Sequence, residues 1–129
     1  MGCDIYMHTE VKIEGKWRHW GIPDIDRQYD LFEKLAGVRG SVYNAVVAPK
    51  GLPEDSTFET LFDYNICKEE YHSMSWLGAE EIKEVYKWWA IVFPDKYIEG
   101  VFGYCMGNGW DDIRDTEVED VRWVFWFDN

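Results

Sequence analysis

The sequence lacks the features of several common protein classes. It has three cysteines, Cys3, Cys67 and Cys105, an odd number with no Cys-x-x-Cys spacing. A disulfide framework or a zinc ribbon is therefore not expected, and a reducing cytosol is the expected compartment. It has no apolar run long enough to span a bilayer, and no phosphate-binding loop, EF-hand loop or His-Glu-x-x-His motif. We therefore expect a soluble protein without those chemistries.

Positive charge is also scarce. Thirteen Lys and Arg stand against 25 Asp and Glu, which gives a formal net charge of −12. Non-specific nucleic-acid binding depends on basic contacts to phosphate, so the composition argues against it. The same charge is compatible with docking on a basic protein and with solubility alone.

Aromatic residues, by contrast, are abundant. They make up 18% of the chain and include eight Trp among 129 residues. A chain of this length supports one core, and we expect a single domain over residues 1–129. Such an aromatic surplus is typical both of a core and of a docking surface.

The alternation of apolar residues predicts three strands. The first runs from Cys3 to about Ile13, with its odd-numbered side chains facing the core. Glu14-Gly15 is a turn signal, so residues 16–20 return as the partner of an N-terminal hairpin. Residues 121–127 alternate in the same way and form a closing strand. The first and last strands are the expected central pair of the sheet.

Helical spacing predicts two helices. One runs from Arg27 to Ala36, is capped by Asp26 and stops at Gly37; the other follows Gly78 and ends before Pro94. Residues 39–55 predict a long ordered loop or a short-strand region, 57–65 have no clear pattern, and the Gly-rich segment 98–110 predicts a strand and turn. The fold class is therefore α+β, a small antiparallel sheet with two or three helices on one face.

One face of the first strand is polar. Asp4, Tyr6, His8 and Glu10 alternate onto it, and carboxylate and imidazole both bind divalent metals. A metal site would use Asp4, His8 and, from outside the strand, His72, with Glu10 or His72 as base. The alternative is that these side chains face solvent or bond to loops.

The segment 71–77 is a second candidate. His72 is suited to act as a general base or ligand, with Ser73 or Ser75 as its partner, and amides at the following helix start are suited to bind an anion. The alternative is that the serines bond locally and Trp76 anchors the helix.

Three arginines lie near aromatic residues: Arg27 with Tyr29, Arg39 beside Gly40, and Arg122 in the last strand. Guanidinium groups bind phosphate or carboxylate, and aromatic rings stack on bases, so these residues predict a nucleotide pocket. The alternative is that they pair with the many acids of this chain.

Several motifs together resemble an uncharacterised family of small proteins from tailed phages and prophages. These motifs are Met1-Gly2-Cys3-Asp4-Ile5, Arg27-x-Tyr29-Asp30-Leu31-Phe32, Val38-Arg39, Gly51-Leu52-Pro53, His72-Ser73-x-Ser75-Trp76-Leu77 and Val124-Phe125-Trp126-Phe127-Asp128. The family opens Met-Gly-Cys-Asp-Ile-His, whereas this chain has Tyr6 in that place. The resemblance implies a phage or prophage origin, and accessory phage proteins of this kind act on host machinery or host immunity by binding.

These observations favour non-enzymatic binding in the bacterial cytosol as a counter-defence function. The partner would be a host protein or a small nucleotide signal, with no membrane association. The alternative is a small metal-dependent, phosphoesterase-like hydrolase using Asp4, His8 and His72. The residues expected to bind are Asp4, Tyr6, His8, Arg27, Tyr29, Arg39, His72, Ser73, Trp76 and Arg122.

Overall fold

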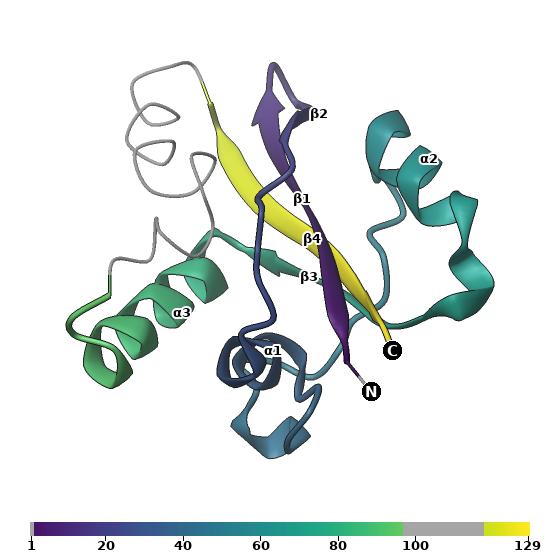
Figure 1. Cartoon of the computed structure of the whole chain (residues 1–129). Helices are drawn as coiled ribbons and strands as arrows, with labels where there is room; N and C mark the ends of the chain where they lie inside the picture. The colour runs from purple at the N-terminus through teal and green to yellow at the C-terminus, as the bar shows by residue number, and fades with distance from the viewer. Residues whose placement is uncertain (1, 97–117) are drawn as a thin grey trace.

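A four-stranded antiparallel sheet organises the chain. The computed structural model describes residues 2–96 and 118–129 (Figure 1). The strands β1 (Asp4–Ile13), β2 (Lys16–Gly21), β3 (Tyr71–Gly78) and β4 (Asp120–Asp128) lie in the order β2-β1-β4-β3. The predicted α+β class, hairpin and closing strand are confirmed. The predicted strand and turn at 98–110 lie outside the described residues.

The first and last strands form the centre of the sheet, as predicted. They pair in register from Asp4 opposite Asp128 to Lys12 opposite Asp120. The hairpin turn at Glu14-Gly15 has positive φ at both residues, the conformation of a type I′ turn. β3 pairs with the other side of β4 and forms one edge.

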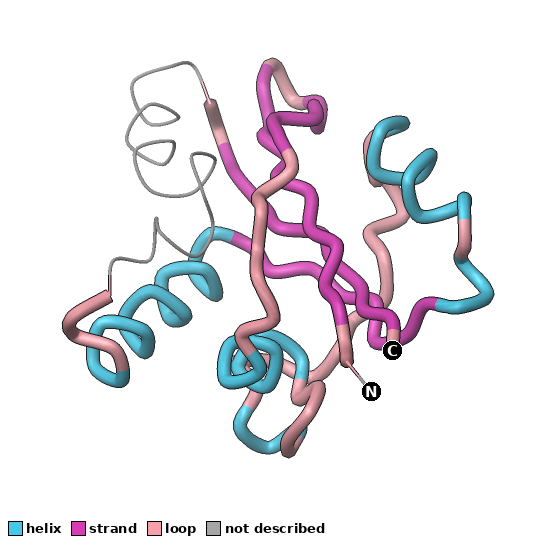
Figure 2. The backbone as a smooth tube through the Cα atoms, viewed as in Figure 1, coloured by secondary structure: helices cyan, strands magenta, loops and turns pink. Residues whose placement is uncertain are grey.

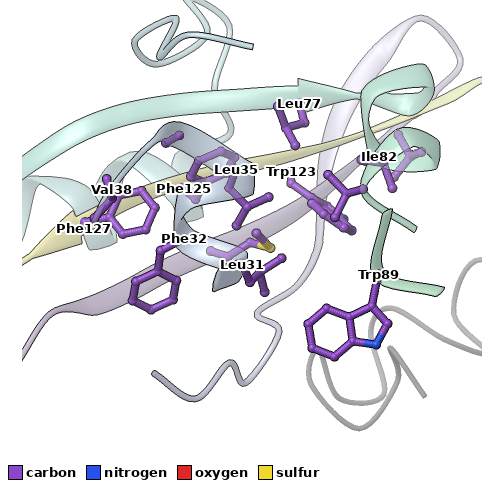
Figure 3. Packing of buried hydrophobic residues seen from close by; sticks show 14 of the residues in the cluster. Leu31, Phe32, Leu35, Val38, Leu77, Ile82, Trp89, Trp123, Phe125 and Phe127 are labelled. Atoms are coloured by element: carbon purple, nitrogen blue, oxygen red, sulfur yellow. The ribbon is translucent and has the colours of Figure 1, made fainter. Parts of the chain in front are cut away.

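Two helices, α1 (Tyr29–Ala36) and α3 (Ala79–Val92), cover one face of the sheet. Their apolar sides pack on the odd-numbered residues of β1 and β4, as Figure 3 shows for Trp123, Phe125 and Phe127. Burial of this apolar surface is the main source of stability. The cluster also includes Leu31, Phe32, Leu35, Leu77, Ile82, Val85 and Trp89.

The helix ends agree with the sequence in part. Gly37 ends α1 in the left-handed conformation (φ 77°), as predicted, and its N–H donates to the Glu33 carbonyl at 2.8 Å. The helix begins later than predicted, however: its N-cap is Gln28 and not Asp26. Gly78 is the N-cap of α3, and its N–H donates to Glu81 Oε1 at 2.9 Å. That amide is therefore already bonded and not open to an anion.

A third helix, α2 (Phe58–Ile66), lies across the sheet from α1 and α3 (Figure 1). The segment that leads to it, residues 37–57, is loop except for the 3-10 turn Val42–Asn44 (Figure 2). This segment passes the β3 edge, where Gly51 N–H donates to the Met74 carbonyl at 2.9 Å. A second 3-10 turn, Lys68–Glu70, joins α2 to β3. Among the described residues, no helix is long and apolar enough to cross a membrane.

Candidate functional site

The middle of the β1 polar face, at His8 and Glu10, is buried beneath α2, whereas the Asp4 side chain at its end is 48% exposed. Glu10 is 0% exposed, His8 1%, and Arg122 on the neighbouring strand 4%. The residues that the structure describes form no metal site here. The alternative, that these side chains face solvent or bond to loops, describes Asp4, which is half exposed, and Glu10, which bonds to Thr57 at the end of the loop before α2. Buried charges are stable only when paired and hydrogen-bonded, so the partners of these side chains decide what the face does.

Glu10 is held by four hydrogen bonds. Its Oε2 accepts from the Thr57 N–H (2.9 Å), the Thr57 hydroxyl (2.7 Å) and the Thr60 hydroxyl (2.7 Å). Its Oε1 accepts from Arg122 Nε at 2.7 Å. Arg122 also donates from Nη1 to Asp55 Oδ1 at 2.8 Å. Because Thr57 is the N-cap of α2, this network fixes the start of that helix to the sheet.

The electrostatics of Glu10 favour the carboxylate. Burial has the largest single effect on its pKa and raises it, but the hydrogen bonds from Thr60, Thr57 and Arg122 together outweigh burial and lower the pKa. The carboxylate also lies at the positive end of the α2 dipole. Glu10 therefore anchors α2 as an anion.

A second, partly buried chain of hydrogen bonds holds the middle of α2. His8 Nε2 lies 2.7 Å from Asp63 Oδ2, and His8 Nδ1 lies 2.8 Å from His19 Nε2. Burial, followed by the neighbouring His8, lowers the pKa of His19. Tyr64 completes the contact by packing edge-on against Trp126, with ring centroids 5.2 Å apart.

α2 therefore turns its polar side inward and its apolar side outward. Phe58, Phe62 and Ile66 are 75%, 62% and 63% exposed, although phenylalanine and isoleucine are among the residues most often found inside proteins. They recur at every fourth residue and so share one helix face. We call these three residues the α2 stripe. Leu61 and Asn65 complete a shallow groove of about 470 Å³ along it.

The α2 stripe lies in an acidic segment of the sequence. Residues 54–70 contain six acids and one base, Lys68. The six acids are Glu54, Asp55, Glu59, Asp63, Glu69 and Glu70. All of them except Asp63 are exposed. Of the two acids on α2 itself, Asp63 bonds inward to His8, whereas Glu59 is exposed.

A separate cleft lies on the opposite side of the sheet, where α1 ends and β3 begins. It measures about 520 Å³ and is lined by Ala36, Gly37, Val38, Arg39, His72, Ser73 and Asn129. Three predicted binding residues, Arg39, His72 and Ser73, meet here. Tyr29, a fourth, lies beside them: the Arg39 guanidinium is over its ring at 4.8 Å. We call this the Ser73 cleft.

No family model, curated protein or solved structure matches this chain. The assignment of function therefore depends on these two surfaces and on the chemistry of the residues that form them.

The structure does not bring Asp4, His8 and His72 together as the metal hypothesis requires. Asp4 pairs with Arg27 (Nε to Oδ1, 2.7 Å), and His8 is bonded to Asp63 beneath α2. His72 stacks on Phe127, a residue of the other sheet face. Within residues 2–96 and 118–129, no three His, Cys, Asp or Glu side chains are placed to hold a metal.

The three arginines of the predicted nucleotide pocket do not meet at one site either. Arg27 binds Asp4, and Arg122 is bonded to Glu10 and Asp55 with its guanidinium 4.0 Å from the Trp17 ring centroid. The alternative expectation, pairing with acids, describes both arginines. Only Arg39 lines the Ser73 cleft.

The other predicted residues have structural partners. The Tyr6 hydroxyl donates to Asp128 Oδ2 at 2.9 Å, and burial, followed by this bond, raises the pKa of Tyr6. Lys50 Nζ lies over the Trp76 ring, 3.6 Å from the ring centroid. Trp76 also lines an open cleft of about 640 Å³ with Trp17 and Asp55.

Sequence reasoning alone did not identify the α2 stripe. Its signal was present, because Phe58, Phe62 and Ile66 have helical spacing inside an acidic segment. An apolar face at that spacing, however, is normally assigned to the core.

Proposed function

We propose that this protein is a phage-type accessory binding protein that blocks a partner protein through the α2 stripe. The observation that carries the proposal is the inverted orientation of α2: its inward contacts include polar groups bonded to Glu10 and His8, while its largest apolar side chains face outward. Folding of this chain does not use those three side chains for its core, so their exposure needs another explanation. A partner that covers them supplies one.

The size of the stripe suits a helix bound in a groove. Such helices place apolar anchors every three or four residues into a hydrophobic groove of the partner. Full burial of one large apolar side chain contributes roughly 1.5–3 kcal/mol. Three anchors therefore offer about 5–9 kcal/mol before the costs of association, enough for a few residues to dominate binding.

Charge identifies the chemistry of the partner. The stripe lies in an acidic segment, and the whole chain carries a formal charge of −12. Two copies of this surface would repel each other, whereas Lys and Arg around an apolar groove would attract it and speed association. We infer a basic partner protein in the bacterial cytosol, and the phage-family resemblance points to a host defence protein.

Of the two forms of binding that the sequence suggested, protein docking has the stronger support. Nucleotide sequestration needed several arginines around one pocket. Arg27 and Arg122 are bonded to Asp4, Glu10 and Asp55 elsewhere in the fold. The α2 stripe, by contrast, is assembled on a single helix.

Site-specific photo-crosslinking in bacterial cells tests the proposal. A benzoylphenylalanine is placed at position 62, and a matched protein carries it at position 43, where Tyr43 is 95% exposed but lies outside the stripe. We expect position 62 alone to give an adduct, with a partner peptide that carries Lys or Arg beside apolar residues. Unlabelled wild-type protein should compete for the adduct, and the Phe62→Glu variant should not.

The other outcomes count against the proposal. Equal crosslinking at positions 43 and 62 would mean non-specific contact, and no adduct at position 62 would leave the stripe without a partner. A crosslink to a second copy of the chain would make the stripe a self-association surface. Sedimentation of the purified protein checks that last outcome independently.

A further inference from the structure

The Ser73 cleft contains a hydrogen-bonded chain of serine, histidine and asparagine. Ser73 Oγ lies 3.0 Å from His72 Nδ1, and His72 Nε2 lies 3.2 Å from Asn129 Oδ1. An amide oxygen only accepts hydrogen bonds, so Nε2 of His72 carries the ring proton. Nδ1 then presents its lone pair to the Ser73 hydroxyl. This is the arrangement in which a histidine removes the proton of a nucleophilic serine.

The backbone is shaped to make this contact. Adjacent residues of a regular strand point to opposite faces, so His72 and Ser73 would ordinarily be unable to bond. Here β3 has an irregularity between His72 and Ser75, and Ser73 adopts φ 56°. Bulges re-aim side chains and are common beside active sites.

The same strained conformation occurs on the facing wall of the cleft. Among the described residues, three that are not glycine have positive φ: Glu14, Arg39 and Ser73. Glu14 belongs to the hairpin turn. The other two both line the Ser73 cleft. Such strain costs about 1–3 kcal/mol per residue and concentrates at functional sites.

We propose that Ser73 is a nucleophile activated by His72 and that the cleft hydrolyses small esters. Ser73 Oγ attacks the ester carbonyl carbon while its proton passes to His72 Nδ1. The ester C–O bond then breaks, and the alcohol leaves with the proton from His72. Water attacks the acyl-serine with His72 again as base, which releases the carboxylic acid and restores Ser73.

The neighbours of the pair support this role and define the substrate. Asn129 holds the tautomer of His72, and Phe127 stacks on its ring with centroids 6.1 Å apart. Both are positioning residues. Arg39 brings a permanent positive charge to the opposite wall. The cleft is therefore suited to an ester that also carries a carboxylate or phosphate.

Covalent labelling tests the nucleophile. The folded full chain is exposed to an alkyl fluorophosphonate, which reacts with activated serines, and the adduct is located by peptide mass mapping. We expect a single adduct on Ser73, with loss of labelling in Ser73→Gly and at least about 100-fold slower labelling in His72→Gln, the scale of general-base catalysis. Glycine accepts the positive φ, so Ser73→Gly keeps the local backbone. Ser75→Ala is the matched control, because the Ser75 hydroxyl accepts from Lys50 N–H and has no histidine partner.

Hydrolysis kinetics test the substrate class. Nitrophenyl acetate is compared with a nitrophenyl ester that carries a free carboxylate. Arg39→Gln should raise KM for the charged ester with little change in kcat, and should leave the neutral ester unaffected.

Three results would overturn the proposal: wild-type protein that stays unlabelled while folded, labelling at equal rates in wild type and His72→Gln, or an adduct on another serine. An unchanged KM for the charged ester in Arg39→Gln would refute the substrate class. The chemistry in this cleft does not involve the α2 stripe, so either proposal can fail without the other.

Discussion

The substitution Glu10→Gln should release the start of α2 and destabilise the protein by about 3 kcal/mol. Glu10 accepts three hydrogen bonds on one oxygen and one from Arg122 on the other. A glutamine has one acceptor end and one NH₂ end, so whichever way it turns, its NH₂ group faces donors. Breaking a buried ion pair costs about 3–5 kcal/mol. The lower end applies here because Asp55 still holds Arg122 at 2.8 Å.

Two measurements locate the effect. Urea unfolding should show the lower free energy, and thermal unfolding should show a Tm lower by roughly 10 °C for a chain of this length. Hydrogen exchange should show where the loss begins: amides of α2 should exchange faster than those of β1 and β4, since a local opening there no longer breaks the Glu10 bonds.

The matched control is Glu80→Gln. Glu80 pairs with Lys83 at 3.2 Å on the exposed side of α3, and such pairs contribute at most about 1 kcal/mol. If Glu10→Gln also stayed within 1 kcal/mol of wild type, or if α2 exchange were unchanged, the view that Glu10 anchors α2 would be refuted.

Three further predictions concern pH, a helix end and the Ser73 backbone. Because the folded state holds the pKa of Glu10 below its ordinary value of 4.5, the contribution of Glu10 to stability is present above that pH and is lost as the pH falls through the folded pKa. Acid titration of the unfolding free energy should show this loss below about pH 4.5, and the Glu10→Gln variant should show a smaller loss. Gly37→Ala should lower the unfolding free energy by more than about 2 kcal/mol in urea, because φ is 77° and the new Cβ would lie 2.5 Å from Val42 Cα. The matched variant Gly15→Ala, at φ 75° with open space around it, should lower it by only about 1–2 kcal/mol. Ser73→Gly should stay within about 1 kcal/mol of wild type, since relief of the positive φ offsets the lost hydroxyl bond; a loss above 2 kcal/mol would contradict the strain at this residue.

The central strands and two helix limits, the end of α1 and the start of α3, were accessible from the sequence because local rules determine them. Alternation across residues 3–13 and 121–127 identifies the inward side chains, and both strands are buried as expected. Gly37 and Gly78 mark helix limits through their own backbone preferences.

α2 and β3 were missed for different physical reasons. The inward side of α2 is polar, so hydrophobic periodicity marks the exposed side of the helix and would orient it the wrong way round. β3 ends directly at the N-cap of α3, and its irregularity at residues 73–74 interrupts the alternation that marks a strand. The role of the β1 polar face could not be predicted from the sequence either. Its residues were grouped correctly, but their partners Thr57, Thr60 and Asp63 lie about 50 residues away, and only the fold brings them into contact.

The inverted α2 separates two properties that usually change together. A residue that both packs in a core and contacts a partner cannot be changed for the partner without a cost to folding. Here the binding side chains point away from the groups that hold the helix in place. Substitutions at positions 58, 62 and 66 should therefore cost the fold little, which would leave the proposed docking surface free to change with its partner.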